Sequence, residues 1–229
     1  MRLPRKLRSL QGREAIWFYT VRMAMPPNEL VALLIAVSFA AGLNVYATVA
    51  TLGLLGHTKW FVLPVSLHLL TDWWVIAAAL ALFAVEFFAD KIPAFDLVWN
   101  ALHTLIRVPM AALLAYQATV ALSPGEQLLA ALAGGVIALI AHGGKTAARA
   151  AVTPSPEPAS NVALSMGEDV FAVLLTGLAV WKPYLAAAIA AVLVVTILLM
   201  ARWVVRRIRQ LFAGGRKPRM VDHAPRRNL

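Results

Sequence analysis

The amino-acid sequence predicts an all-α, polytopic integral membrane protein with about six transmembrane helices. Of its 229 residues 61% are hydrophobic and 14% are charged, and the mean hydropathy is +0.74, whereas soluble domains carry about 25% charged residues. The apolar residues come in blocks of about 18 or more, the length that crosses a bilayer. Basic residues gather at the two ends of the chain, as the positive-inside rule leads one to expect of a membrane protein.

Six apolar segments follow one another along the chain. The first follows Asn28 and Glu29, which come after two prolines and favour the start of a helix. A turn at 123–125 separates the third segment from the fourth, and Lys182-Pro183 separates the fifth from the sixth. The predicted segments are Leu30–Leu55, Trp73–Asp90, Leu97–Leu122, Gln127–Ala150, Leu164–Trp181 and Tyr184–Val205.

The chain therefore divides into three parts. We expect a basic N-terminal segment with an interfacial helix (1–27), a six-helix membrane domain (28–208) and a basic, disordered cytoplasmic tail (209–229). The stretch from His57 to Asp72 is apolar but contains Pro64, which favours an interfacial or re-entrant piece. If that stretch crossed the membrane instead, the number of spans would be odd and the two tails would face opposite sides.

The net charge of +10 would suit nucleic acid, but its distribution argues against that partner. Six basic residues precede Asn28 and nine follow from Arg202 onward, at either side of an apolar middle. An even number of spans places both basic ends in the cytoplasm, where they meet anionic lipid head groups. We expect a bacterial cytoplasmic (inner) membrane protein with both termini cytoplasmic. The absence of cysteine excludes disulfides and thiolate chemistry.

Polar residues recur within the apolar segments at helical spacing. A charged side chain at the centre of a membrane helix costs at least about 2.5–3.5 kcal/mol, so such residues usually face the interior of a bundle or a cavity. Asp96, Asn100, His103 and Arg107 share one helical face. The full set of candidate residues for a solute or ion cavity is Asn44, Glu86, Asp90, Lys91, Asp96, Asn100, His103, Arg107, His142, Lys145, Arg149, Asn161, Glu168 and Asp169.

Arg107 is the most deeply placed cation of this set. It lies about 15 Å along the third predicted helix, so it should pair with a carboxylate, either Glu86 or Glu168. Asn44 lies near mid-membrane and could form the floor of the cavity. The alternative is that the whole set consists of buried salt bridges that only hold the helices together.

A weak internal repeat suggests duplication of a two-helix hairpin. Pro-Ala precedes Asp96 by three residues and precedes Asn161 by the same distance, so each polar residue could cap the helix that follows. Both hairpins would cross the membrane in the same sense. The matches are few, and chance explains them equally well.

No recognised nucleotide or metalloprotease motif is present. Gly143-Gly144-Lys145-Thr146 resembles the end of a P-loop, but the upstream glycine is missing. Whether His103, His142, Glu86 and Glu168 approach one another closely enough for a metal is not readable from spacing across four helices. We expect no cofactor.

Several spaced polar blocks resemble a bacterial and plastid membrane family catalogued as domain of unknown function 4126. The resemblance covers about residues 30 to 200. The blocks that carry it are Gly42-Leu43-Asn44-Val45-Tyr46, Glu86 to Pro93, Asp96 with Trp99, His103 and Arg107-Val108-Pro109, His142 to Lys145, Arg149, Ser155 to Pro158, Ser160-Asn161 and Glu168-Asp169. The resemblance implies a polytopic membrane protein and brings no activity with it.

These observations favour a membrane transporter or channel-like protein with a mixed-charge cavity open to the cytoplasm. Arg107, Lys145 and Arg149 would hold a small anionic or zwitterionic solute, a lipid head group or an ion, while the carboxylates pair with them or carry a coupling proton or cation, and His103 relays protons. A membrane-embedded enzyme that acts on a lipid is the alternative, and a non-catalytic scaffold is a third. The sequence is also compatible with assembly into a homo-oligomer.

Overall fold

The computed structural model describes residues 25–58, 63–89, 93–152 and 158–214, which form seven α-helices and one 3₁₀ helix and contain no strand. The all-α expectation is confirmed. The elements are α2 (Pro27–Leu43), α3 (Val45–His57), η2 (Val65–Thr71), α4 (Trp73–Ala89), α5 (Pro93–Ala118), α6 (Pro124–Val152), α7 (Pro158–Trp181) and α8 (Pro183–Gly214).

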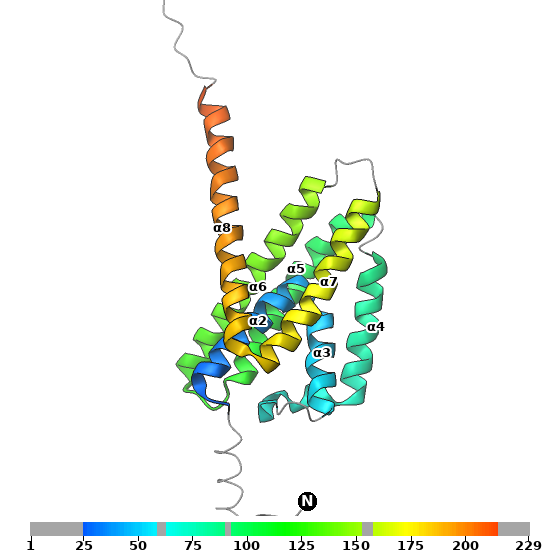
Figure 1. Cartoon of the computed structure of the whole chain (residues 1–229), viewed down its shortest axis with the longest axis vertical. Helices are drawn as coiled ribbons and strands as arrows, with labels where there is room; N and C mark the ends of the chain where they lie inside the picture. Colours follow the sequence, from blue (N-terminus) through cyan, green and yellow to red (C-terminus); the bar gives the residue numbers. More distant parts are fainter. Residues whose placement is uncertain (1–24, 59–62, 90–92, 153–157, 215–229) are drawn as a thin grey trace, which may run out of the picture.

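The last five helices run alternately up and down as a bundle (Figure 1). Each helix from α5 to α8 begins with a proline, a residue suited to the first turn because no helical hydrogen bond is lost there. Ser123 and Glu126 form a capping box at the start of α6. The Ser123 amide donates to Glu126 Oε2 (3.0 Å), and the Glu126 amide donates to Ser123 Oγ (3.4 Å). Lys182 lies between α7 and α8, as expected. The turn expected at 123–125 falls slightly earlier: α5 ends at Ala118, and Pro124 and Gly125 already belong to the first turn of α6.

The first predicted segment does not form one continuous helix. Asn44 adopts extended backbone (φ −152°, ψ 103°) and separates α2 from α3, which together form a hairpin. Asn28 at the start of α2 donates a hydrogen bond to the Tyr184 hydroxyl (2.6 Å), and the His57 ring at the end of α3 lies 4.5 Å from the Trp73 ring. Tyr184 and Trp73 begin helices that both leave the lower end of the bundle, so the hairpin starts and ends there (Figure 1).

The hairpin lies at the centre of the molecule. Twelve of the 17 residues of α2 are buried, and the helix contacts α5, α6, α7 and α8. Gly42 makes this closeness possible, because a Cβ at this position would collide with the carbonyl oxygen of Ala138 and lie 2.8 Å from the Ala141 Cβ. α2 therefore brings the break at Asn44 into the middle of the bundle.

The described part of the 57–72 stretch favours the interfacial interpretation. η2 has seven residues and is bent by 64° from α4. Seven residues of 3₁₀ helix extend about 14 Å, too short for a hydrocarbon core of about 30 Å. The Ser66 hydroxyl donates to the Gln117 carbonyl near the end of α5, which fixes η2 at the end of the bundle where α3 finishes.

Among the described helices, three are long and apolar enough to cross a membrane: residues Pro124–Ala151, Val162–Trp181 and Pro183–Leu211. The number becomes four if η2 and α4 together count as one span. The structure thus has the helices of a membrane protein, but the expected six spans are not reached by this measure.

Three further expectations need correction or fall outside the described residues. Asp96 and Asn161 lie inside α5 and α7, three residues after the prolines that begin these helices, so they are not caps. α8 continues to Gly214, so the tail expected to be disordered from residue 209 begins as helix. The interfacial helix expected within 1–27 lies almost entirely outside the described residues.

Candidate functional site

Charged side chains from four helices meet in the bundle and form what we call the charge network: Glu86, Arg107, Lys145, Arg149 and Glu168. They come from α4, α5, α6 and α7, with α6 contributing Lys145 and Arg149. The spacing of four residues places these two cations on one face of α6. Ion pairs join all five into one chain of contacts.

Arg107 is the centre of one half of the network. Its Nη2 donates to Glu86 Oε1, as expected from depth in the sequence, and its Nη1 lies 2.7 Å from His142 Nδ1. Because a guanidinium can only donate, His142 Nδ1 must accept this bond, which leaves the imidazole proton on Nε2. Lys145 Nζ lies 3.7 Å from the same Glu86 oxygen.

Glu168 is the centre of the other half. Arg149 donates to its Oε2 from Nη2 (2.8 Å) and from Nε (3.2 Å). Lys145 Nζ lies 3.4 Å from that oxygen. Lys145 therefore bridges Glu86 and Glu168 and links the two halves.

At the break between α2 and α3, each helix end lies next to a charged group of the opposite sign. Lys145 Nζ donates to the Leu43 carbonyl (3.1 Å) at the end of α2, where the helix carries partial negative charge. Asn44 Oδ1 accepts from the Ala47 amide (2.9 Å) and caps α3, while Asn44 Nδ2 donates to Asp169 Oδ1 (2.8 Å). The carboxylate of Asp169 thus lies next to the partially positive start of α3.

The network is closed in this structure. The side chains of Glu86, Arg107 and Lys145 are 0% exposed, and that of Glu168 is 10% exposed. Among the described residues, Glu86 Oε2 and Arg107 Nε are buried without a hydrogen-bond partner. In the described part of the chain the charged side chains pack against one another, and two buried polar atoms of the network keep unused bonding capacity. The cavity expected to open to the cytoplasm stays a prediction.

His103 lies one turn before Arg107 on α5 and forms a small aromatic group with Tyr46 and Trp99. The Tyr46 hydroxyl lies 3.3 Å from His103 Nε2, and His103 Nδ1 lies 2.9 Å from the Trp99 carbonyl oxygen. Tyr46 and Trp99 were not among the site candidates, although both stand in the polar blocks that carry the family resemblance. Their position within those blocks was the signal that could have identified them.

Nine of the fourteen candidates have side chains in the described structure, and all nine are in or beside this region: Asn44, Glu86, His103, Arg107, His142, Lys145, Arg149, Glu168 and Asp169. Asp90 and Lys91 lie outside the described residues. The side chains of Asp96, Asn100 and Asn161 do so as well, although their backbones belong to α5 and α7. Within the described part of the chain, no group of three or more His, Asp or Glu side chains is arranged to hold a metal ion.

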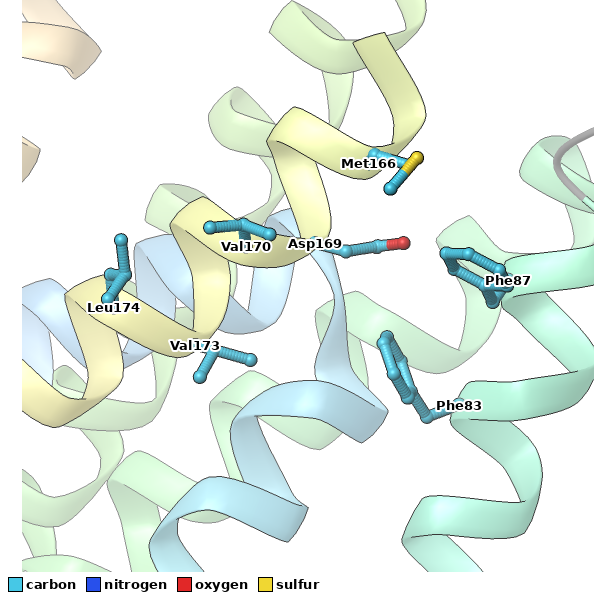
Figure 2. Close-up of a pocket in the computed structure, with 7 residues that line it drawn as sticks. All are labelled: Phe83, Phe87, Met166, Asp169, Val170, Val173 and Leu174. Atoms are coloured by element: carbon cyan, nitrogen blue, oxygen red, sulfur yellow. The ribbon is translucent and has the colours of Figure 1, made fainter. Parts of the chain in front are cut away.

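A groove between α4 and α7 borders Asp169. Figure 2 shows the Asp169 carboxylate extending from α7 toward the Phe83 and Phe87 rings of α4. The groove has a volume of about 220 Å³. Its lining consists of Phe83, Phe87, Met166, Asp169, Val170, Val173 and Leu174.

The fold and the site define a class: an all-helical protein with helices of membrane length, in which a buried ionic network adjoins the break between α2 and α3. The chain belongs to the family described as a domain of unknown function (DUF4126), whose sequence pattern matches residues 31–203. No curated protein and no solved structure shows significant similarity to it.

Proposed function

We propose that the protein is a membrane transporter or channel-like protein for a small anionic or zwitterionic solute or an ion, with the charge network as its binding site. The observation that carries the proposal is the break between α2 and α3 in the middle of the bundle, where Lys145 contacts the Leu43 carbonyl and Asp169 contacts Asn44. In transporters, discontinuous helices near the membrane centre present their polar ends to substrates and coupling ions.

A purely structural role explains the network less well. A buried ion pair is often no more stabilising than well-packed apolar residues of similar volume. Small residues hold helices together at lower cost, and this chain already uses Gly42 against α6 in that way. Five ionisable side chains linked in one buried chain of contacts exceed what helix packing requires.

The bridging position of Lys145 suggests how a solute could bind. Its Nζ reaches Glu86, Glu168 and the Leu43 carbonyl, at 3.7, 3.4 and 3.1 Å. An anion that displaced one carboxylate would take its place between Lys145 and the neighbouring guanidinium. The released carboxylate could then bind a coupling proton or cation, which is the exchange that coupled transport needs.

We further propose a topology of five crossing helices, α4 to α8, with the α2–α3 hairpin entering and leaving on one side. This replaces the expectation of six spans with both termini cytoplasmic, because the start of α2 and the end of α8 then face opposite sides. We assign the α8 end to the cytoplasm, since nine basic residues follow from Arg202 against six before Asn28. The exposed arginines of α8 would contact anionic lipid head groups of a bacterial cytoplasmic membrane.

Flux measurements on reconstituted vesicles test the proposed site. Uptake of labelled phosphate, acetate and alanine would be measured together with proton flux for Lys145→Gln and Glu168→Gln. Losing one charge-assisted contact should lower the flux of the transported probe by about tenfold or more per folded molecule, beyond any loss of folded protein that the Tm reports. Glu126→Gln, at an exposed position, is the matched control and should keep wild-type flux. A loss of flux that only follows a loss of stability would identify the network as structural.

A further inference from the structure

A pocket lies at the end of the bundle where α2 begins and α7 meets α8, the lower end in Figure 1. It has a volume of about 470 Å³ and exposes polar as well as apolar surface. Pockets that hold small organic ligands span about 300–1,000 Å³. The Asn28 side-chain amide donates to the Tyr184 hydroxyl (2.6 Å) and fixes the start of α2 against the start of α8. None of the described lining residues belongs to the charge network, so this pocket is a separate candidate site.

Two residues that line the pocket carry opposite charges. Glu29 stands in the first turn of α2, and Lys182 joins α7 to α8. Neither forms an ion pair within the described part of the chain. Lys182 Nζ lies 5.8 Å from the centroid of the Trp181 ring, a cation–π distance that holds the ammonium beside another lining residue. A ligand with one negative and one positive group would therefore complement both charges.

The position of the pocket along the apolar helices indicates the source of such a ligand. The membrane-length stretch of α7 ends at Trp181, and that of α8 begins at Pro183. Trp181 is 78% exposed and Tyr184 is 52% exposed, and tryptophan and tyrosine at the ends of membrane helices typically lie at the depth of the lipid head groups. Val180 and Leu185 supply apolar lining that suits the glycerol and the first acyl carbons of a lipid.

We propose that this pocket binds the zwitterionic head group of phosphatidylethanolamine, with the phosphate on Lys182 and the ammonium on Glu29. The ethanolamine ammonium has N–H groups to donate to a carboxylate, whereas the trimethylammonium of phosphatidylcholine has none. This inference goes beyond the transport proposal and does not depend on the charge network. It rests on the membrane class of the fold, and the proposed topology places the pocket in the outer leaflet.

Native mass spectrometry of the full chain in tetraethylene glycol monooctyl ether tests the site. It measures the dissociation constant of the first bound dimyristoyl phosphatidylethanolamine, with dimyristoyl phosphatidylcholine as the comparison lipid. Glu29→Gln and Lys182→Gln should each weaken phosphatidylethanolamine binding by about fivefold, the contribution of one exposed ion pair. Lys182→Arg keeps the charge and should keep the affinity. Wild type should prefer phosphatidylethanolamine to phosphatidylcholine, and Glu29→Gln should remove this preference.

Matched controls come from the same end of the bundle. Glu126→Gln, exposed at the start of α6, and Trp74→Leu, at a position on α4 that is 88% exposed and outside the pocket lining, should keep wild-type affinity. Trp181→Leu should weaken binding by about threefold, because the ring beside the Lys182 ammonium is lost. The Tm of each variant shows whether it is folded.

Two results would overturn the proposal. The first is equal affinity of wild type, Glu29→Gln and Lys182→Gln for phosphatidylethanolamine, which would leave only unspecific contact with lipid. The second is displacement of the lipid by free O-phosphoethanolamine, which would identify a soluble ligand in place of a lipid. Because the readout is lipid binding and requires no flux, failure of the transport proposal would leave this inference standing, and the reverse also holds.

Discussion

Arg107 is the residue of the charge network whose loss should cost the most stability. Its side chain is 0% exposed and donates to both Glu86 and His142. Arg107→Ala should lower the free energy of unfolding by about 3–5 kcal/mol, because it leaves the Glu86 carboxylate buried with a weaker set of partners. SDS-induced unfolding of the purified protein in mixed micelles measures this loss.

The pair can be tested as a unit. Replacing both partners, Arg107→Leu with Glu86→Leu, should recover part of the stability that either single change loses, with a coupling energy of about 0.5–3 kcal/mol. Arg202→Ala, at an exposed position on α8, should be nearly neutral and serves as the control. Simple additivity of the two single changes would show that Arg107 and Glu86 do not act together.

Asn44 caps α3 through its side-chain oxygen and donates a hydrogen bond to Asp169 through its side-chain nitrogen. Exchanging the amide and the carboxylate between these two positions separates the two contributions. Asn44→Asp keeps an oxygen to cap α3 but places a second carboxylate against Asp169, so stability should fall by about 1–3 kcal/mol. Adding Asp169→Asn restores one amide and one carboxylate with their roles exchanged. The double variant should regain most of the lost unfolding free energy; a double variant as unstable as Asn44→Asp would mean that the contact between these side chains does not matter.

The sequence identified this residue set through spacing and depth. Arg107 pairs with Glu86, one of two partners expected, and the candidates Lys145 and Arg149 both contact Glu168 in the same cluster. Sequence could not show that Lys145 also bonds to the Leu43 carbonyl. That acceptor exists only because the helix ends there, and a backbone carbonyl has no signature in the sequence.

At the scale of elements, the α2–α6 contact is the one most sensitive to side-chain size. Gly42→Ala should cost about 1–3 kcal/mol of unfolding free energy, because the new Cβ meets backbone atoms of Ala138 that cannot rotate away. Gly143→Ala is a matched control on α6: its Cβ would meet nothing within 4 Å. Since alanine favours helices, that control should be neutral or stabilising by up to about 1 kcal/mol. Equal effects of both changes would contradict close packing at Gly42.

The hairpin is the element that sequence reasoning described wrongly. Residues 30–55 are apolar throughout apart from Asn44 and a few hydroxyl groups, and a span or a buried re-entrant hairpin would both read this way. Asparagine is a common helix cap, so Asn44 carried a signal for a break. Its meaning depended on α6 and α7, whose Lys145 and Asp169 stabilise the two helix ends.

At the scale of the whole molecule, the proposed topology places the start of α2 and the end of α8 on opposite sides of the membrane. The chain has no cysteine, so single cysteines can be introduced without background. Pro26→Cys and Thr58→Cys, both at exposed positions, should react with a membrane-impermeant maleimide from the same side of the membrane. Arg209→Cys on α8 should react only from the other side. Labelling of Pro26→Cys and Thr58→Cys from opposite sides would contradict the proposed hairpin and show that the first segment crosses the membrane.

The sequence by itself determined the helical membrane class, the family resemblance and the residues that form the charge network, because composition, period and spacing are local properties that survive in any packing. Only the tertiary structure decided that the first segment turns back at Asn44, that the network is closed, and that an apolar groove lies beside Asp169. These features depend on which helices approach one another and how closely. Such distances are set by contacts such as Gly42 against Ala138, between residues far apart in the chain.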